Sequence, residues 1–215
     1  MPQSNAKKIA SLGLTLFAVT AITGIILGAV HDITLEPIRV TMENLKTKAL
    51  KDALPEADAF SRVEVSAQAD PLIKSSDVFE ATSGGAPVGH CITVTPRGYS
   101  GPIEIIAGIT KEGRLRAISI LSQSETPGLG AKSAEPDFYE QFEDREAPKL
   151  TVVKSASDAP DEIHAISGAT ITSNGVTDGV NAALAYWRDH LARPGAETEG
   201  GQPHTSAPAI SGEAE

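Results

Sequence analysis

The first apolar segment of the chain is also its longest. Residues 9–30, IASLGLTLFAVTAITGIILGAV, contain no charged side chain. As a helix with a rise of about 1.5 Å per residue, this segment is roughly 33 Å long, enough to cross the core of a bilayer. It is longer than the apolar part of a cleavable signal peptide, and it ends in Leu27-Gly28-Ala29-Val30, a poor cleavage site. The pattern therefore predicts a retained transmembrane helix.

The charges beside this segment predict its orientation. The basic pair Lys7-Lys8 precedes it, whereas Asp32 and Glu36 follow it. Because basic residues are retained on the cytoplasmic side, we expect residues 1–8 in the cytoplasm and the bulk of the chain on the extracytoplasmic side.

A second helical pattern follows the predicted span. Apolar spacing predicts a helix over residues 37–54, with Pro37 in its first turn and Pro55 after its end. Residues 56–76 are polar and show no period, so residues 31–76 are predicted to form a membrane-proximal helix and an irregular connector.

Short runs rich in β-branched residues come next, and glycine-containing turns separate them. The Lys-Glu-Gly-Arg spacer at residues 111–114 is typical of a hairpin turn. A short helix at residues 136–142 and strands at residues 150–153 and 163–166 follow this meander. The four predicted antiparallel strands are residues 77–82, 88–95, 103–110 and 115–121.

The last predicted element is an amphipathic helix over residues 174–191. Residues 192–215 are rich in Gly, Pro, Glu and Ser, and they are predicted to form a disordered tail. The whole pattern predicts an α+β protein, in which one transmembrane helix precedes a domain, residues 77–191, with an antiparallel sheet and flanking helices. The apolar stripe of the last helix is Val176, Val180, Leu184, Trp187 and Leu191.

Composition narrows the possible functions. The formal net charge is -10 and no basic cluster is present, so no nucleic-acid partner is expected. The single cysteine, Cys91, excludes an intrachain disulfide and a multi-cysteine metal site. We expect Cys91 to be a small buried residue in a strand.

Three glycine-containing segments could carry chemistry, residues 98–109, 122–132 and 165–176. Each could also be no more than a turn. In the third, Thr172 or Ser173 is expected to cap a helix that starts near Asn174, which places Thr170 just before a helix N-terminus. Free N–H groups and the helix dipole would stabilise a phosphate there, whether free or attached to the threonine hydroxyl.

Other side chains have weaker claims. The Glu125 carboxylate could accept a hydrogen bond from a ring N–H of a ligand, or it could be solvated. Asp161, Glu162 and His164 are more typical of a surface than of a metal site, so no metal is predicted.

These segments, in this order behind one membrane helix, resemble the G subunit of the Rnf-type ion-translocating electron transport complex. They resemble less closely the C subunit of the sodium-translocating NADH:quinone reductase. In that family a Ser/Thr-Gly-Ala-Thr motif carries FMN as a phosphoester on its threonine, and a Ser-Glu-Thr-Pro-Gly-Leu-Gly loop lies near the flavin ring. The motif is matched by Ser167-Gly168-Ala169-Thr170, the loop by residues 124–130 and a Gly-Tyr-Ser-Gly-Pro-Ile segment by residues 98–103.

The resemblance covers about residues 8–190, and it implies an FMN-binding domain with FMN covalently attached to Thr170. It implies an electron carrier in the cell inner membrane, within a complex that couples NADH–ferredoxin electron exchange to ion movement. The other subunits of that complex, and a transferase that uses FAD as the flavin donor, are the implied partners. No residue of the chain itself is implied to be catalytic. The implied flavin site also includes Ser167, Gly168, Ala169, Glu125, Thr126, Pro127, Gly128, Leu129, Gly130 and Tyr99.

One position departs from the family pattern. The motif usually carries an aspartate three residues before its Ser, and this chain has His164 there. This departure is the best support for one alternative, a flavin-free, membrane-anchored scaffold domain. The other alternative is the C subunit of the quinone reductase.

Overall fold

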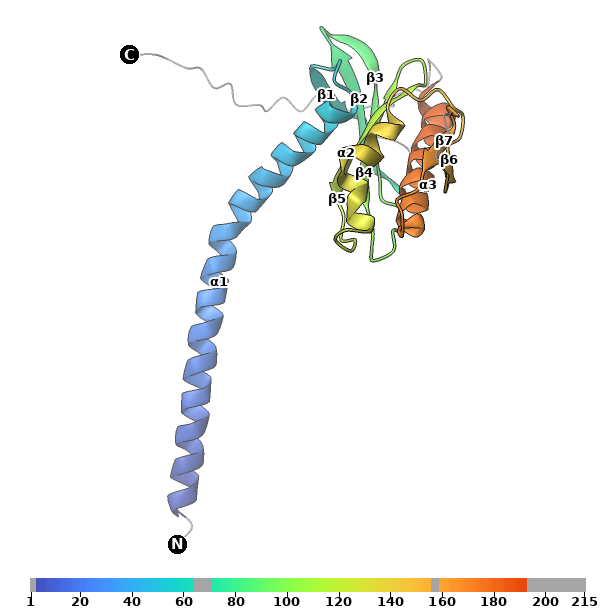
Figure 1. Cartoon of the computed structure of the whole chain (residues 1–215). Coiled ribbons are helices and arrows are strands. Elements are labelled where there is room, and N and C mark those ends of the chain that lie inside the picture. Colours follow the sequence, from blue (N-terminus) through green and yellow to red (C-terminus); the bar gives the residue numbers. More distant parts are fainter. Residues whose placement is uncertain (1–2, 64–70, 156–158, 193–215) are drawn as a thin grey trace, which may run out of the picture. The chain divides into compact units, whose positions relative to one another are not determined.

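A computed structural model describes residues 3–63, 71–155 and 159–192 (Figure 1). The chain divides into two compact units, Met1–Ala49 and Leu50–Glu215. The predicted tail, apart from its first residue, lies outside the described residues.

Helix α1 runs without interruption over Gln3–Ala53. The prediction of a separate helix that starts at Pro37 is wrong, because Pro37 lies inside α1. A proline inside a helix removes one backbone hydrogen bond at a cost of about 3 kcal/mol, which long helical stretches on both sides can offset. Within the described residues, one helix is long and apolar enough to cross a bilayer. Its apolar stretch lies within Ile9–Ala53, where the mean hydropathy reaches 2.1.

The last turn of α1 belongs to the second unit, where it packs on a sheet. Leu50, Ala53 and Leu54 are buried. The carbonyl of Ala53 lies where a side chain at Gly108 would begin, so this close approach requires a glycine. Cys91 is also fully buried, as predicted, and its thiol donates a weak hydrogen bond to the carbonyl of Leu50 at 3.7 Å.

The sheet is an antiparallel meander in the order β1-β2-β3-β4-β5. The four predicted strands are confirmed as β2 to β5, and β2 begins earlier than expected. Strand β1 was not predicted, because its four residues pair only with β2 at the edge of the sheet and carry no clear period of their own. The strands are β1 (Ala59–Arg62), β2 (Ile73–Ser83), β3 (Ala86–Val94), β4 (Glu104–Thr110) and β5 (Leu115–Ser122).

The predicted hairpin turn between β4 and β5 is present. Gly113 adopts a φ of 88° there, a conformation that favours glycine. The backbone N–H of Gly113 donates to the carbonyl of Thr110 at 2.9 Å.

Helix α3 (Thr170–Tyr186) covers one face of the sheet (Figure 1). Val176, Val180 and Leu184 are buried against Ile92 and Ile105 and their neighbours in one apolar core. The helix continues as a single π-helical turn, η3 (Trp187–Leu191). The predicted apolar stripe is confirmed, but the predicted start near Asn174 is four residues too late.

Smaller elements complete the domain. The helix predicted at residues 136–142 is present as α2 (Pro136–Tyr139) and the 3-10 turn η2 (Glu140–Phe142). The predicted strands near residues 150 and 163 are β6 (Thr151–Val153) and β7 (Glu162–His164), which form a separate parallel pair. A further 3-10 helix, η1 (Gly130–Ala134), follows the loop at residues 124–130.

Candidate functional site

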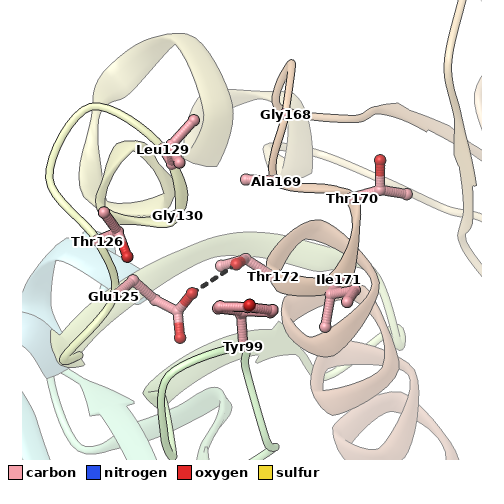
Figure 2. A pocket seen from close by; sticks show the side chains of 10 residues that line it. All are labelled: Tyr99, Glu125, Thr126, Leu129, Gly130, Gly168, Ala169, Thr170, Ile171 and Thr172. Atoms are coloured by element: carbon pink, nitrogen blue, oxygen red, sulfur yellow. Dashed lines mark hydrogen bonds between the residues drawn. The ribbon is translucent and has the colours of Figure 1, made fainter.

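Three segments that are distant in sequence surround one cavity of about 440 Å³ (Figure 2). The segments are the loop after β3, the loop between β5 and η1, and the first turn of α3. They are the same three glycine-containing segments that the sequence singles out. The residues that line the cavity are Tyr99, Glu125, Thr126, Leu129, Gly130, Gly168, Ala169, Thr170, Ile171 and Thr172.

Three of the predicted site residues do not line this cavity. Pro127 and Gly128 form the outer bend of their loop, and Gly128 adopts a φ of 76°. The bend lets the N–H groups of Leu129 and Ala131 both donate to the carbonyl of Thr126, at 3.1 and 3.2 Å. Ser167 lines a neighbouring cavity of about 200 Å³.

Two lining residues, Ile171 and Thr172, were not predicted as part of the site. Thr172 was one of two residues expected to cap α3, with Ser173 as the other, but the helix starts at Thr170, after Ala169. Thr172 therefore lies inside the first turn, and its hydroxyl donates to Glu125 Oε2 at 2.6 Å instead. Gly168 adopts a φ of 78° and ends the segment before the helix. A glycine at this position is the sequence signal that could have moved the expected start of α3 to Thr170, and so placed Thr172 in the site.

The hydroxyl of Ser173 also serves the helix start, though not as a cap. It donates to the carbonyl of Ala169 at 3.1 Å and accepts from the N–H of Ile166 at 2.9 Å. Ser173 is fully buried. Its side chain therefore joins the segment between β7 and α3 to the first turn of the helix.

Thr170 differs from both of these neighbours. It is the first residue of α3, and its side chain is partly exposed at the cavity. Figure 2 shows this side chain across the cavity from Glu125, pointing away from the bond between Glu125 and Thr172. Within the part of the chain that the structure describes, the Thr170 hydroxyl makes no hydrogen bond. It is therefore the free hydroxyl at this helix N-terminus.

Glu125 forms the floor of the cavity, and its side chain is only 6% exposed. Its Oε1 accepts a hydrogen bond from the N–H of Ser100 at 2.8 Å. With Oε2 accepting from Thr172, both oxygens are engaged within the protein. Of the two alternatives for Glu125, a solvated carboxylate is therefore the one that the structure contradicts.

The mouth of the cavity is apolar. Tyr99, Leu129 and Ile171 are 69%, 44% and 56% exposed. Among the described residues of the second unit, these are the large apolar side chains that face solvent. Such a concentration at one place is typical of a binding site.

The charges around the cavity are few. Glu125 is the one carboxylic acid among the lining residues, and no Lys, Arg or His is among them. An anion in this cavity would therefore depend on backbone N–H groups at the start of α3, which have no acceptor within the helix.

His164 lies away from this cavity, at the end of β7. Its Nε2 lies 3.2 Å from the carbonyl of Lys154. Its backbone N–H donates to Gln141 Oε1 at 2.7 Å. His164 and Ser167 both line the smaller neighbouring cavity.

The sequence of this chain is similar to those of known proteins, and the similarity includes the segments around the cavity. The sequence pattern of the family described as FMN-binding domain matches residues 98–185, which contain all three segments around the cavity. The chain is 33% identical over 177 residues to the G subunit of the proton-translocating ferredoxin:NAD(+) oxidoreductase complex of Clostridium ljungdahlii, with 79% of this chain and 90% of that protein covered.

A second relative, the G subunit of the Na(+)-translocating ferredoxin:NAD(+) oxidoreductase complex of Acetobacterium woodii, is 33% identical over 198 residues, which cover 87% of this chain and 95% of the relative. Among solved structures, the C subunit of the Na(+)-translocating NADH-quinone reductase of Parabacteroides distasonis matches with a TM-score of 0.44 and 29% identity, over 51% of this chain and 59% of that one. The extent of the two matches to G subunits shows that the chain belongs to the G-subunit family of ion-translocating ferredoxin:NAD(+) oxidoreductase complexes, and that it carries an FMN-binding domain.

Proposed function

We propose that the protein is a membrane-anchored electron carrier that holds FMN covalently on Thr170. It works within a complex that couples electron transfer between ferredoxin and NAD to ion translocation. The observation that carries the proposal is the free hydroxyl of Thr170 at the N-terminus of α3, beside a cavity with an apolar mouth.

The cavity suits the flavin ring system. Its volume of about 440 Å³ lies in the range of roughly 300–1,000 Å³ that is usual for small-molecule sites. Tyr99, Leu129 and Ile171 offer apolar surface to a flat ring, and an aromatic side chain such as Tyr99 can stack on one. These side chains would orient the ring and exclude water from it, while the bound FMN supplies the redox chemistry.

The lining of the same cavity supports a covalent link. With no basic side chain among its lining residues, it lacks the ion pairs that usually hold a free phosphate group. The N–H groups at the start of α3 would stabilise the phosphate charge. An ester bond to Thr170 would add the attachment that ion pairs do not supply.

The attachment reaction is a group transfer from FAD. The Thr170 oxygen forms a bond to the phosphorus of the FMN half, the bond from that phosphorus to the AMP half breaks, and AMP leaves. The hydroxyl proton is released to solvent. Thr170 suits this role because its hydroxyl is accessible, whereas those of Thr172 and Ser173 are buried and bonded. A separate flavin transferase is the partner that performs the step.

The membrane and the other subunits of the complex are the remaining partners. The apolar run in α1 anchors the chain. Lys7-Lys8 on its N-terminal side orients the second unit towards the extracytoplasmic side of the inner membrane. Protease added to intact spheroplasts should therefore digest the second unit, and protection of that unit would contradict the orientation.

A direct test uses the full chain purified in detergent after co-expression with a flavin transferase. We expect a flavin absorbance spectrum that bleaches on reduction, and an intact mass increased by one FMN less one water. A flavin-free scaffold domain would show neither. Colourless protein of unmodified mass, obtained with a transferase that is active on a positive-control substrate, would contradict the proposal.

A further inference from the structure

Glu125 joins two of the three segments that surround the cavity. One oxygen accepts from the backbone N–H of Ser100, beside Tyr99, at 2.8 Å. The other accepts from the hydroxyl of Thr172, in the first turn of α3, at 2.6 Å. The carboxylate thus joins the loop that presents Tyr99 to the helix turn that begins with Thr170, and Figure 2 shows its bond to Thr172.

The packing around Glu125 holds this bridge in one geometry. A side chain at Gly98 would begin 2.5 Å from Oε1. A side chain at Gly130 would begin in contact with Oε2 and 2.6 Å from the hydroxyl of Thr172. The two glycines therefore let the backbone close over the carboxylate from both sides. The backbone N–H of Glu125 is itself held by Gln123 Oε1 at 2.6 Å.

The bonding pattern fits an ionised carboxylate with a positioning role. An ionised carboxylate only accepts hydrogen bonds, and here an N–H group and an O–H group donate to it. Hydrogen bonds to a charged group are stronger than neutral ones. Each oxygen of Glu125 already accepts one bond from the protein, so the carboxylate holds the two segments together before any ligand is bound.

We propose that Glu125 is a positioning residue, which ties the Tyr99 loop to the first turn of α3 and so sets the place of the flavin ring relative to its attachment point. The identity of the ligand in this proposal rests on the proposed function. The bridge between Ser100 and Thr172 does not, since it is formed by the protein alone.

The first test measures amide hydrogen exchange on the full chain without flavin. In Glu125→Gln the neutral side chain keeps its size but can offer its one oxygen to only one of the two donors. We expect exchange at Ser100 or in the first turn of α3 to accelerate roughly tenfold or more, as the loss of a charge-assisted bond implies. Exchange unchanged at both places would overturn the proposal.

The second test uses the flavin-loaded full chain and its visible circular dichroism, which reports the surroundings of the ring. Thr172→Val removes the hydroxyl at nearly constant volume and should change this spectrum, while Thr172→Ser should restore it. Thr177→Val is the matched control, because Thr177 is also buried in α3 and its hydroxyl donates to the carbonyl of Ser173 at 2.9 Å.

We expect Thr177→Val to keep the native flavin spectrum even if it lowers the melting temperature. A spectrum altered equally by Thr172→Val and Thr177→Val, or one that Thr172→Ser fails to restore, would overturn the positioning role. If the proposed function is wrong, neither the wild type nor any variant will carry flavin. The exchange measurement, which needs no flavin, would still test the bridge between Ser100 and Thr172.

Discussion

The indole N–H of Trp187 donates a hydrogen bond to Nδ1 of His90 at 3.3 Å, which joins the π-helical turn after α3 to strand β3. Burial lowers the pKa of His90, while Glu80, its partner across β2 and β3, acts in the opposite direction. A protonated Nδ1 could no longer accept the indole bond. The neutral imidazole is therefore the form that fits the fold.

This pair predicts a stability that falls in acid. Because the unfolded chain takes up the His90 proton at a higher pH than the folded chain does, the free energy of unfolding should decrease as the pH drops through about 6.5 and below. Trp187 is the sole tryptophan of the chain, so its fluorescence reports the same event. His90→Gln keeps an acceptor without a titrating group. Its urea unfolding should depend less on pH between about 7 and 5, and an unchanged dependence would exclude His90 as the cause.

Cys91 should be inert in the folded protein. Burial raises the pKa of its thiol to about 12, and the thiolate is the form that reacts with electrophiles. Alkylation by iodoacetamide at a pH of about 8 should be slower than that of a free cysteine by about three orders of magnitude on this ground alone. Mass spectrometry should find the native chain unmodified and the guanidinium-unfolded chain modified once. Rapid labelling of the native chain would show that Cys91 is accessible.

Gly175 in α3 should not tolerate a side chain. A methyl group there would begin 2.5 Å from the carbonyl oxygen of Arg97. Alanine is a better helix former than glycine by about 1 kcal/mol, but overpacking of this kind typically costs roughly 1–3 kcal/mol. Gly175→Ala should therefore destabilise the domain and displace the neighbouring Tyr99 loop.

The matched control for this change is one residue away. Asn174 is exposed on the same helix, so Asn174→Ala should leave the domain as stable or stabilise it by a few tenths of a kcal/mol. Thermal unfolding of both variants decides the matter. Equal stability of Gly175→Ala and Asn174→Ala would mean that the contact with Arg97 relaxes without cost.

Much of the fold was predictable because its signals are local. Alternating β-branched runs and a glycine turn such as that at Gly113 define β2 to β5, and a 3.6-residue stripe defines α3. The start of α3 was misplaced because Thr172 and Ser173 are residue types that often cap helices. Their hydrogen bonds to Glu125 and to the carbonyl of Ala169 show that both lie inside the first turn. Strand β1 depends on its pairing with β2, which no short window of sequence contains.

The segments that form the site were predictable, but the contacts between their side chains were not. The glycine-containing motifs identified the three segments that surround the cavity. The role of Glu125 was not predictable, because its partners Ser100 and Thr172 are 25 and 47 residues away in the sequence. Ile171 was missed because an exposed apolar residue in a helix becomes meaningful only when it stands beside Tyr99 and Leu129.

The most direct test of the account is the Thr170→Ala variant, co-expressed with a flavin transferase and examined for flavin fluorescence in a denaturing gel and by intact mass. A phosphoester needs an oxygen from the protein, and Thr170 offers the free hydroxyl at the N-terminus of α3, beside the cavity. We expect Thr170→Ala to fold and to lose the FMN mass completely. Thr170→Ser should retain part of it, and Ser167→Ala and Thr172→Ala, as hydroxyl-removing controls, should keep it. Covalent FMN that persists in the Thr170→Ala protein would contradict the assignment.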